Sequence, residues 1–158
     1  MNNVEINKQA KLSQHFTLGE LCKTSVRTAD GNIPSHVHIE NLKRVCSWLE
    51  MLRSEWNNRY GDGDVPIIIN SGYRSAQVNK AVGGGVATSN HLTGCAVDIR
   101  VLGMEQLLRY AVILLDISDE SQEDFDELLI ERNARGTYWL HFAVRPEGNR
   151  RKIRLIAC

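Results

Sequence analysis

An apolar stripe in the first half of the chain predicts one long helix, and this pattern restricts the fold more than any other. Its members recur every three to four residues, the spacing that places side chains on one face of an α-helix. They are Val37, Leu42, Val45, Leu49, Leu52 and Trp56. The GDGD segment at 61–64 ends this helix. Ahead of it, Thr17 and Glu20 have capping-box spacing and predict a short first helix.

The remaining patterns are shorter and predict mainly strands. Strands are predicted in VPIIIN (65–70), CAVDIRV (95–101), ELLIE (127–131), YWLHFAV (138–144) and KIRLIAC (152–158). The last two are expected to close the sheet as an antiparallel pair around the P-E-G-N turn. Helices are predicted in SAQVNKAV (75–82), ended by Gly83, Gly84 and Gly85, and in MEQLLRYAVILLD (104–116). The fold class is therefore α+β, with a small, mostly antiparallel sheet packed by N-terminal helices.

The size and charge of the chain indicate one ordinary globular domain. A chain of 158 residues can bury a core without metal or disulfide staples. Residues 1–14 are polar and are predicted to form a flexible N-terminal arm, followed by a single domain over residues 15–158. Lys and Arg together number 19, as do Asp and Glu, so the overall charge favours neither a nucleic-acid partner nor an anionic membrane. The basic segment RPEGNRRKIRL (145–155) is a local exception, which we interpret as a solvated hairpin turn.

His91 and Asp98 stand in the arrangement H-x-x-G-x-A-x-D, and a second histidine follows at His141. Gly94 allows a tight reversal after His91, and on an alternating strand Asp98 points back toward the loop that carries His91. If the two strands are neighbours, His141 faces the same cleft as Asp98. Two imidazoles and one carboxylate, with water in the fourth position, suit a catalytic zinc site. A chance spacing of structural histidines is the alternative.

At these residues the chain resembles the zinc D-Ala-D-Ala carboxypeptidases and related murein endopeptidases, whose fold is shared with the hedgehog signalling domain. HFTLGELCKT is similar to the amino-terminal helix of the small phage- and bacteria-associated branch of that family. SGYRS, VNKAVGGG, SNHLTGCAVDI and WLHF follow in the family's order and cover most of residues 15–145. The resemblance implies a hedgehog/D-Ala-D-Ala-peptidase-like fold and a single zinc peptidase domain over residues 15–158.

The resemblance also implies roles for individual residues. His91, Asp98 and His141 would hold Zn²⁺. Arg74 of SGYR would pair with the acyl part or the terminal carboxylate of a muropeptide, because its planar guanidinium can bind a carboxylate through two hydrogen bonds. A structural salt bridge behind the site is the alternative for Arg74. The residues expected to line the substrate cleft are Ser89 and Asn90, with Tyr73 and Trp139 in its wall.

The general base is where the chain departs from the family's best-known pattern. Many relatives carry a Glu or Asp a few residues before the last histidine, but Tyr138 and Trp139 stand there. The nearest upstream carboxylate is Glu131. In this respect the chain resembles the small phage- and bacteria-associated branch of the family, which carries a glutamate at this position. We assign Glu131 as the base because it follows an apolar run, as a residue emerging from sheet to cleft would. Glu127 shares its strand face and is the rival, and two solvated strand-end charges are the remaining alternative.

Together these features predict a zinc metallopeptidase that hydrolyses peptidoglycan stem or cross-link peptides, as D-Ala-D-Ala carboxypeptidases do. The alternatives are an L-alanyl-D-glutamate endopeptidase of the phage lysin type and a non-catalytic, zinc-stabilised cell-wall-binding module. The amino terminus lacks the apolar core of a signal peptide and no segment reaches transmembrane length, so synthesis in the cytoplasm is expected. Action on the cell wall then points to release as in phage lysis. A monomer is expected.

Overall fold

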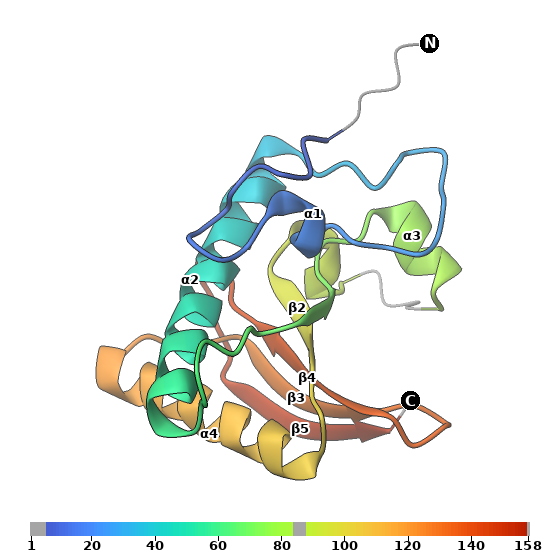
Figure 1. The fold of residues 1–158 in the computed structure, drawn as a ribbon. Coiled ribbons are helices and arrows are strands. Elements are labelled where there is room, and N and C mark those ends of the chain that lie inside the picture. Colours follow the sequence, from blue (N-terminus) through green and yellow to red (C-terminus); the bar gives the residue numbers. More distant parts are fainter. Residues whose placement is uncertain (1–5, 84–87, 158) are drawn as a thin grey trace.

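The computed structural model describes residues 6–83 and 88–157 and has the predicted α+β architecture (Figure 1). Its strands form one five-stranded sheet in the order β1-β2-β4-β3-β5. Neighbouring strands are antiparallel except for the pair β3 and β5. The strands are β1 (Ile69–Ser71), β2 (Ala96–Arg100), β3 (Glu127–Arg132), β4 (Tyr138–Ala143) and β5 (Lys152–Ala157).

Helices α2 and α4 pack against each other and against the same face of the sheet (Figure 1). The helices are α1 (Leu18–Leu21), α2 (His36–Arg59), α3 (Ala76–Ala81), the 3₁₀ helix η1 (Asn90–Thr93) and α4 (Met104–Ser121). The predicted capping box of Thr17 and Glu20 opens α1, and Ser35 with His38 forms a second one at the start of α2. The cover of the sheet therefore combines an N-terminal helix with one from the middle of the chain.

The apolar stripe of α2 lies in the core, with one exception. Leu42, Leu49 and the other central members of the stripe are fully buried, and Trp56 packs edge-on against Tyr110 of α4. Placing Val37 on this face was wrong, because its side chain is 66% exposed. Val37 lies five residues before Leu42, which rotates it about 140° around the helix axis.

The two faces of the sheet have different characters, and this difference positions the site. Apolar side chains of alternate residues in β2, β3 and β4 point into the core beneath α2 and α4; they are Val97, Ile99, Leu128, Leu140 and Phe142. The residues between them point to the opposite face. They include most of the acidic residues of the central strands and their histidine. Asp98 of β2 lies directly opposite His141 of β4, as the prediction of neighbouring strands required. Glu127 and Glu131 of β3 share that face.

The predicted antiparallel pairing of 138–144 with 152–158 was wrong. β5 pairs in parallel with β3, in the register Glu127 to Lys152, at the edge of the sheet. The reason is that β2 and β3 already occupy both sides of β4, so the chain leaving β4 must cross to the free side of β3. The 145–151 connection is consequently not a hairpin turn.

The structure adds detail to three further predictions. The run VPIIIN contributes only a three-residue strand, and Ile68 is exposed while Ile67 and Ile69 are buried. Helix α3 is followed by Gly83 with φ +77°, whereas Gly84 and Gly85 lie outside the described residues. Residues 6–14 run beside α1 and place Ile6, Ala10 and Leu12 against the core. Among the helices that the structure describes, none has the length and apolarity to cross a membrane.

Candidate metal centre

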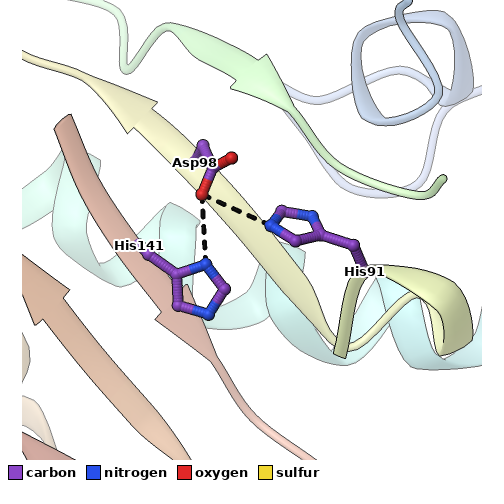
Figure 2. A group of neighbouring side chains, drawn as sticks. All are labelled: His91, Asp98 and His141. Atoms are coloured by element: carbon purple, nitrogen blue, oxygen red, sulfur yellow. Dashed lines mark hydrogen bonds and ion pairs between the residues drawn. The ribbon is translucent and has the colours of Figure 1, made fainter. Parts of the chain in front are cut away.

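Three side chains converge on one point at the polar face of the sheet (Figure 2). Asp98 Oδ1 lies 3.3 Å from His91 Nε2 and 3.1 Å from His141 Nδ1. One ligand atom from each of the three residues lies within 4.8 Å of the others. Two ligands about 2.1 Å from a tetrahedral zinc ion are about 3.4 Å apart, so the two distances from Asp98 Oδ1 match the coordination geometry of zinc.

His91 is held so that its Nε2 faces the site. It lies in η1, which ends at Gly94 in the left-handed conformation with φ +76°, and a Cβ at Gly94 would come within 2.6 Å of the His38 carbonyl oxygen. His91 Nδ1 lies 2.7 Å from the carbonyl oxygen of Gly72, which can only accept, so Nδ1 carries the proton. His91 Nε2 is buried and has no hydrogen-bond partner. A buried lone pair of this kind is what a zinc ligand requires, so the donor set fits the metal.

Asp98 and His141 stabilise each other's charged forms. Burial opposes the negative charge of Asp98, but the neighbouring His91 and His141 outweigh it and hold the pKa of Asp98 well below its usual range. Burial likewise opposes a positive charge on His141, but hydrogen bonds to Asp98 and Glu127 outweigh it and raise the pKa of His141 to about 9. The carboxylate is therefore ionised at neutral pH, the state in which it binds a metal ion, and a metal ion at the cluster would displace the Nδ1 proton of His141.

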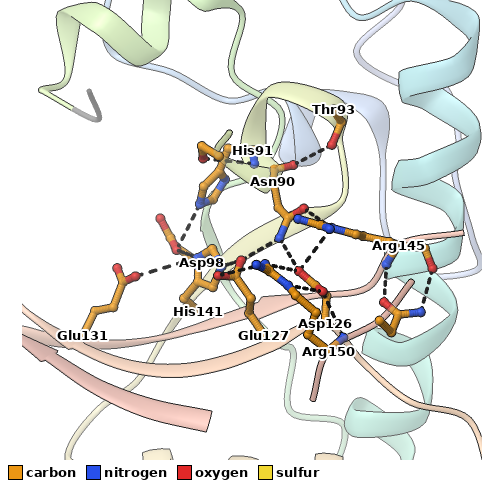
Figure 3. A network of polar contacts seen from close by, with 12 residues as sticks. Asn90, His91, Thr93, Asp98, Asp126, Glu127, Glu131, His141, Arg145 and Arg150 are labelled. Carbon is orange, nitrogen blue, oxygen red and sulfur yellow. Dashed lines mark hydrogen bonds and ion pairs between the residues drawn. The ribbon is translucent and has the colours of Figure 1, made fainter. Parts of the chain in front are cut away.

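The two glutamates of β3 stand on either side of His141 and have different surroundings (Figure 3). Glu131 Oε1 lies 3.9 Å from His141 Nδ1, on the side of the ring that faces Asp98, and its Oε2 accepts a 2.7 Å hydrogen bond from Trp139 Nε1. Burial raises the pKa of Glu131. Glu127 instead lies 3.1 Å from His141 Nε2, and although burial opposes its charge, the hydrogen bond to His141 lowers its pKa to about 2. Glu131 thus has the properties of a proton acceptor, whereas Glu127 is a weak base.

Arg74 lies at the rim of the three-residue cluster. Its Nη2 is 3.7 Å from Asp98 Oδ2, and its backbone N–H donates to the carbonyl oxygen of His91. Its Nε is buried without a hydrogen-bond partner. The long contact with Asp98 leaves the guanidinium with unused donors beside the cluster, a geometry open to both the substrate role and the structural role expected for Arg74.

The four residues predicted to line the cleft occupy different environments. Ser89 accepts a hydrogen bond from the His91 N–H and, with Asn90, lines a pocket of about 280 Å³ between α2 and the 145–146 segment. Trp139 is half-buried and bonds to Glu131. Tyr73 is 5% exposed and stacks on His38, with ring centroids 4.9 Å apart. Their contact with substrate stays a prediction.

Sequence reasoning missed an ionic cluster around a buried carboxylate next to the site. Asp126 is fully buried and accepts two hydrogen bonds from the guanidinium of Arg150, at 3.0 and 2.8 Å (Figure 3). Arg145 Nε lies 3.2 Å from Asp126 and donates to Asn90 Oδ1. The solvated hairpin turn predicted for 145–155 was therefore wrong. The available signal was Asp126 itself, a carboxylate directly after Phe125 and next to the apolar run of a predicted strand, because a charge that is buried there needs a partner.

Comparison with known families fits this geometry. A family model described as Peptidase M15 matches residues 14–114 of the 158. The chain belongs to the peptidase M15 family. No curated protein matches it. M15 peptidases are zinc-dependent metallopeptidases, so the chain is a zinc metallopeptidase, and its buried group of His91, Asp98 and His141 could bind the metal.

The matched segment of this M15 peptidase contains only part of the site. It includes Arg74, His91 and Asp98 and ends within α4, before β3 and β4. The inclusion of His141 and the two glutamates consequently rests on their position in the sheet, opposite and beside Asp98.

In this M15 peptidase we expect the Asp126 cluster to make stability sensitive to acid. Burial opposes the charge of Asp126, but the hydrogen bonds from Arg150 outweigh it and lower its pKa to about 2. A lowered pKa stabilises the folded state above the unfolded-state value near ~4, and this contribution is lost as the pH falls toward about 2. Urea unfolding at a series of pH values should therefore show the wild type about 2 kcal/mol more stable than Asp126→Asn near neutrality, with the gap closing in acid. Parallel curves would contradict this assignment.

Proposed function

We propose that the protein hydrolyses peptide bonds in the stem or cross-link peptides of peptidoglycan, in the manner of a D-Ala-D-Ala carboxypeptidase. The observation that carries the proposal is the convergence of His91, Asp98 and His141 at zinc-ligand spacing in a chain of the peptidase M15 family. The family resemblance supplies the substrate class, and the site supplies the chemistry. Action at the cell wall follows from that substrate, and release as in phage lysis is our proposed route to it.

The side chains around the site would have two separate tasks in the reaction, metal binding and proton transfer. His91, Asp98 and His141 would hold zinc, which supplies a Lewis acid and makes water a nucleophile at neutral pH. Glu131, with one oxygen fixed by Trp139 and the other 3.9 Å from His141, accepts a proton from the attacking water. The protonated Glu131 then donates that proton to the leaving amine nitrogen. Partial burial of Glu131 suits the first step, because a raised pKa makes its carboxylate a stronger proton acceptor than an ordinary glutamate.

Two other functions remain as alternatives. An L-alanyl-D-glutamate endopeptidase of the phage lysin type would use the same ligands and base, because its specificity lies in the shape of the cleft. A non-catalytic, zinc-stabilised binding module would keep the ligands but needs no general base. The partly buried Glu131 beside His141 favours an enzyme over such a module, because removing an unneeded carboxylate from water is costly.

The test is cleavage of defined muropeptides by the zinc-loaded protein, with the fragments identified by mass spectrometry. Release of the terminal D-alanine supports the carboxypeptidase. Cleavage between L-alanine and D-glutamate supports the endopeptidase and overturns the carboxypeptidase assignment. Bound zinc without cleavage of any stem peptide would leave the binding module.

Replacing Arg74 separates its two expected roles. Arg74→Lys keeps the positive charge but loses the paired hydrogen bonds of the guanidinium. If the guanidinium binds a substrate carboxylate, kcat/KM should fall about 10-fold or more through a higher KM. Zinc content and thermal stability should then stay unchanged. If Arg74 instead serves a structural salt bridge with Asp98, the same variant should lose zinc affinity or stability. Steady-state kinetics beside a zinc titration decides between them.

A further inference from the structure

The network behind His141 gives Glu127 a role that differs from catalysis. We propose that Glu127 is a positioning residue: it fixes the ring of His141 by accepting its Nε2 proton, and Asn90 holds Glu127 in place for this task. The inference rests on the proposed zinc site and extends it to the residues outside the ligand set.

The first argument concerns which nitrogen of His141 is available. A histidine that binds a metal ion through one ring nitrogen is neutral and carries its one N–H on the other nitrogen, and an ionised carboxylate can only accept. Glu127 Oε1 lies 3.1 Å from His141 Nε2, so the proton of the neutral ring belongs at Nε2. The lone pair then lies on Nδ1, the atom that points to Asp98 Oδ1. Glu127 therefore selects the one tautomer that can bind a metal ion at the cluster.

The second argument concerns what holds Glu127. Its side chain is 13% exposed, and its Oε1 accepts a 2.6 Å hydrogen bond from Asn90 Nδ2. Asn90 is itself fixed at both ends of its amide, because Nδ2 also donates to Asp126 and Oδ1 accepts from Arg145 Nε (Figure 3). The carboxylate of Glu127 is thus locked by a buried polar network.

The third argument concerns connection between the ligands. Asn90 immediately precedes His91 in η1, while Glu127 lies in β3 and touches the ring of His141 in β4. The side-chain amide of Asn90 therefore links η1, which carries His91, to the carboxylate of Glu127, which orients His141. Because Asn90 uses its amide in this way and is 5% exposed, its main task is to assemble the site.

The strand register separates this role from that of the base. Leu129 is the residue of β3 directly opposite His141, so Glu127 and Glu131 lie on the two diagonals. Glu131 approaches Nδ1, and Glu127 approaches Nε2 on the far side of the ring. The two glutamates therefore differ in which nitrogen they serve, and their removal should have different consequences.

The experiment is a zinc titration against a competing chromophoric chelator at neutral pH, with wild type, Glu127→Ala, Glu127→Gln and Glu131→Gln. We expect Glu127→Ala to weaken zinc affinity about 10- to 100-fold. Glu127→Gln should lose less, because its carbonyl oxygen can still accept from Nε2. Glu131→Gln should bind zinc as the wild type does, and circular dichroism of each metal-free variant checks that it folds.

A second readout reports on the tautomer itself. In the zinc-loaded wild type, ¹⁵N shifts of the imidazoles should show His141 protonated at Nε2, and Glu127→Ala should broaden or shift these signals while leaving those of His15 unchanged. In saturating zinc, Glu127→Ala should also retain more activity than Glu131→Gln. Wild-type zinc affinity in a folded Glu127→Ala overturns the positioning role alone. A wild type that binds no zinc overturns the proposed site and this inference together.

Discussion

Replacing His91 with alanine should abolish both zinc binding and peptide hydrolysis. The variant loses the Nε2 lone pair that is buried without a hydrogen-bond partner and leaves only Asp98 and His141 as protein ligands. Two ligands hold zinc too weakly for a catalytic site, which needs three. We expect zinc to fall from about one ion per chain to background in metal analysis of the dialysed protein. Hydrolysis of the muropeptide substrate should fall to background in the same sample.

The matched control is another histidine that pairs with a carboxylate. His15 Nδ1 lies 2.8 Å from Glu50 Oε2 of α2, in a hollow whose lining includes none of the three residues of the cluster. His15→Ala removes a similar side chain and should keep zinc and turnover. If His91→Ala retained one zinc per chain, the metal would have to lie elsewhere, and the role of His91, Asp98 and His141 as ligands would be wrong.

Replacing Glu131 with glutamine should reduce turnover without loss of zinc. Glutamine keeps the size of the side chain and can still accept from Trp139, but it cannot take a proton from water. Loss of a general base typically costs about 10²- to 10⁴-fold in rate, so kcat should fall by that factor while the metal content stays that of the wild type. Stopped assays at saturating substrate, run on samples of known zinc content, measure both quantities.

Glu127→Gln is the control for this prediction, because it makes the same chemical change on the same strand face. Under our assignment it weakens zinc binding and affects the rate less than Glu131→Gln does once zinc is saturating. The opposite pattern, with zinc-loaded Glu127→Gln inactive and Glu131→Gln active, would make Glu127 the base. Comparing Glu127→Gln with Glu131→Gln thus distinguishes the general base from the positioning residue.

The sequence could name most of the central residues because their chemistry is local. The spacing of His91, Gly94 and Asp98 describes a turn followed by a strand, and both are short-range structures whose geometry depends on neighbouring residues. His141 was added from the alternation of a later strand, on the condition that the two strands are neighbours, and the family resemblance supported the same three residues. The structure brings Asp98 and His141, two of the three candidate ligands, together through the pairing of β2 with β4. The sequence could not separate Glu131 from Glu127, because both stand on the same face of one strand and differ only in which nitrogen of His141 they approach.

The prediction for the C-terminal strand was wrong for a related reason. Alternation along 152–158 indicates a strand but carries no information on its partner, and the turn-like P-E-G-N segment suggested the preceding strand. In the structure β4 already has neighbours on both sides, so β5 pairs with β3, and the connection between β4 and β5 carries Arg145 and Arg150 to Asp126. The partner of a strand at the edge of the sheet therefore depends on how all the other strands pair.

The sequence by itself determined the fold class of this protein, most of its helices and strands and the three residues expected to hold zinc, because helical stripes, strand alternation and the H-x-x-G-x-A-x-D turn are local patterns. Only the tertiary structure decided the place of β5, the buried cluster around Asp126 and the division of roles between Glu127 and Glu131. These features depend on contacts between residues far apart in the chain. Such contacts follow from the packing of the whole sheet, which no single stretch of sequence encodes.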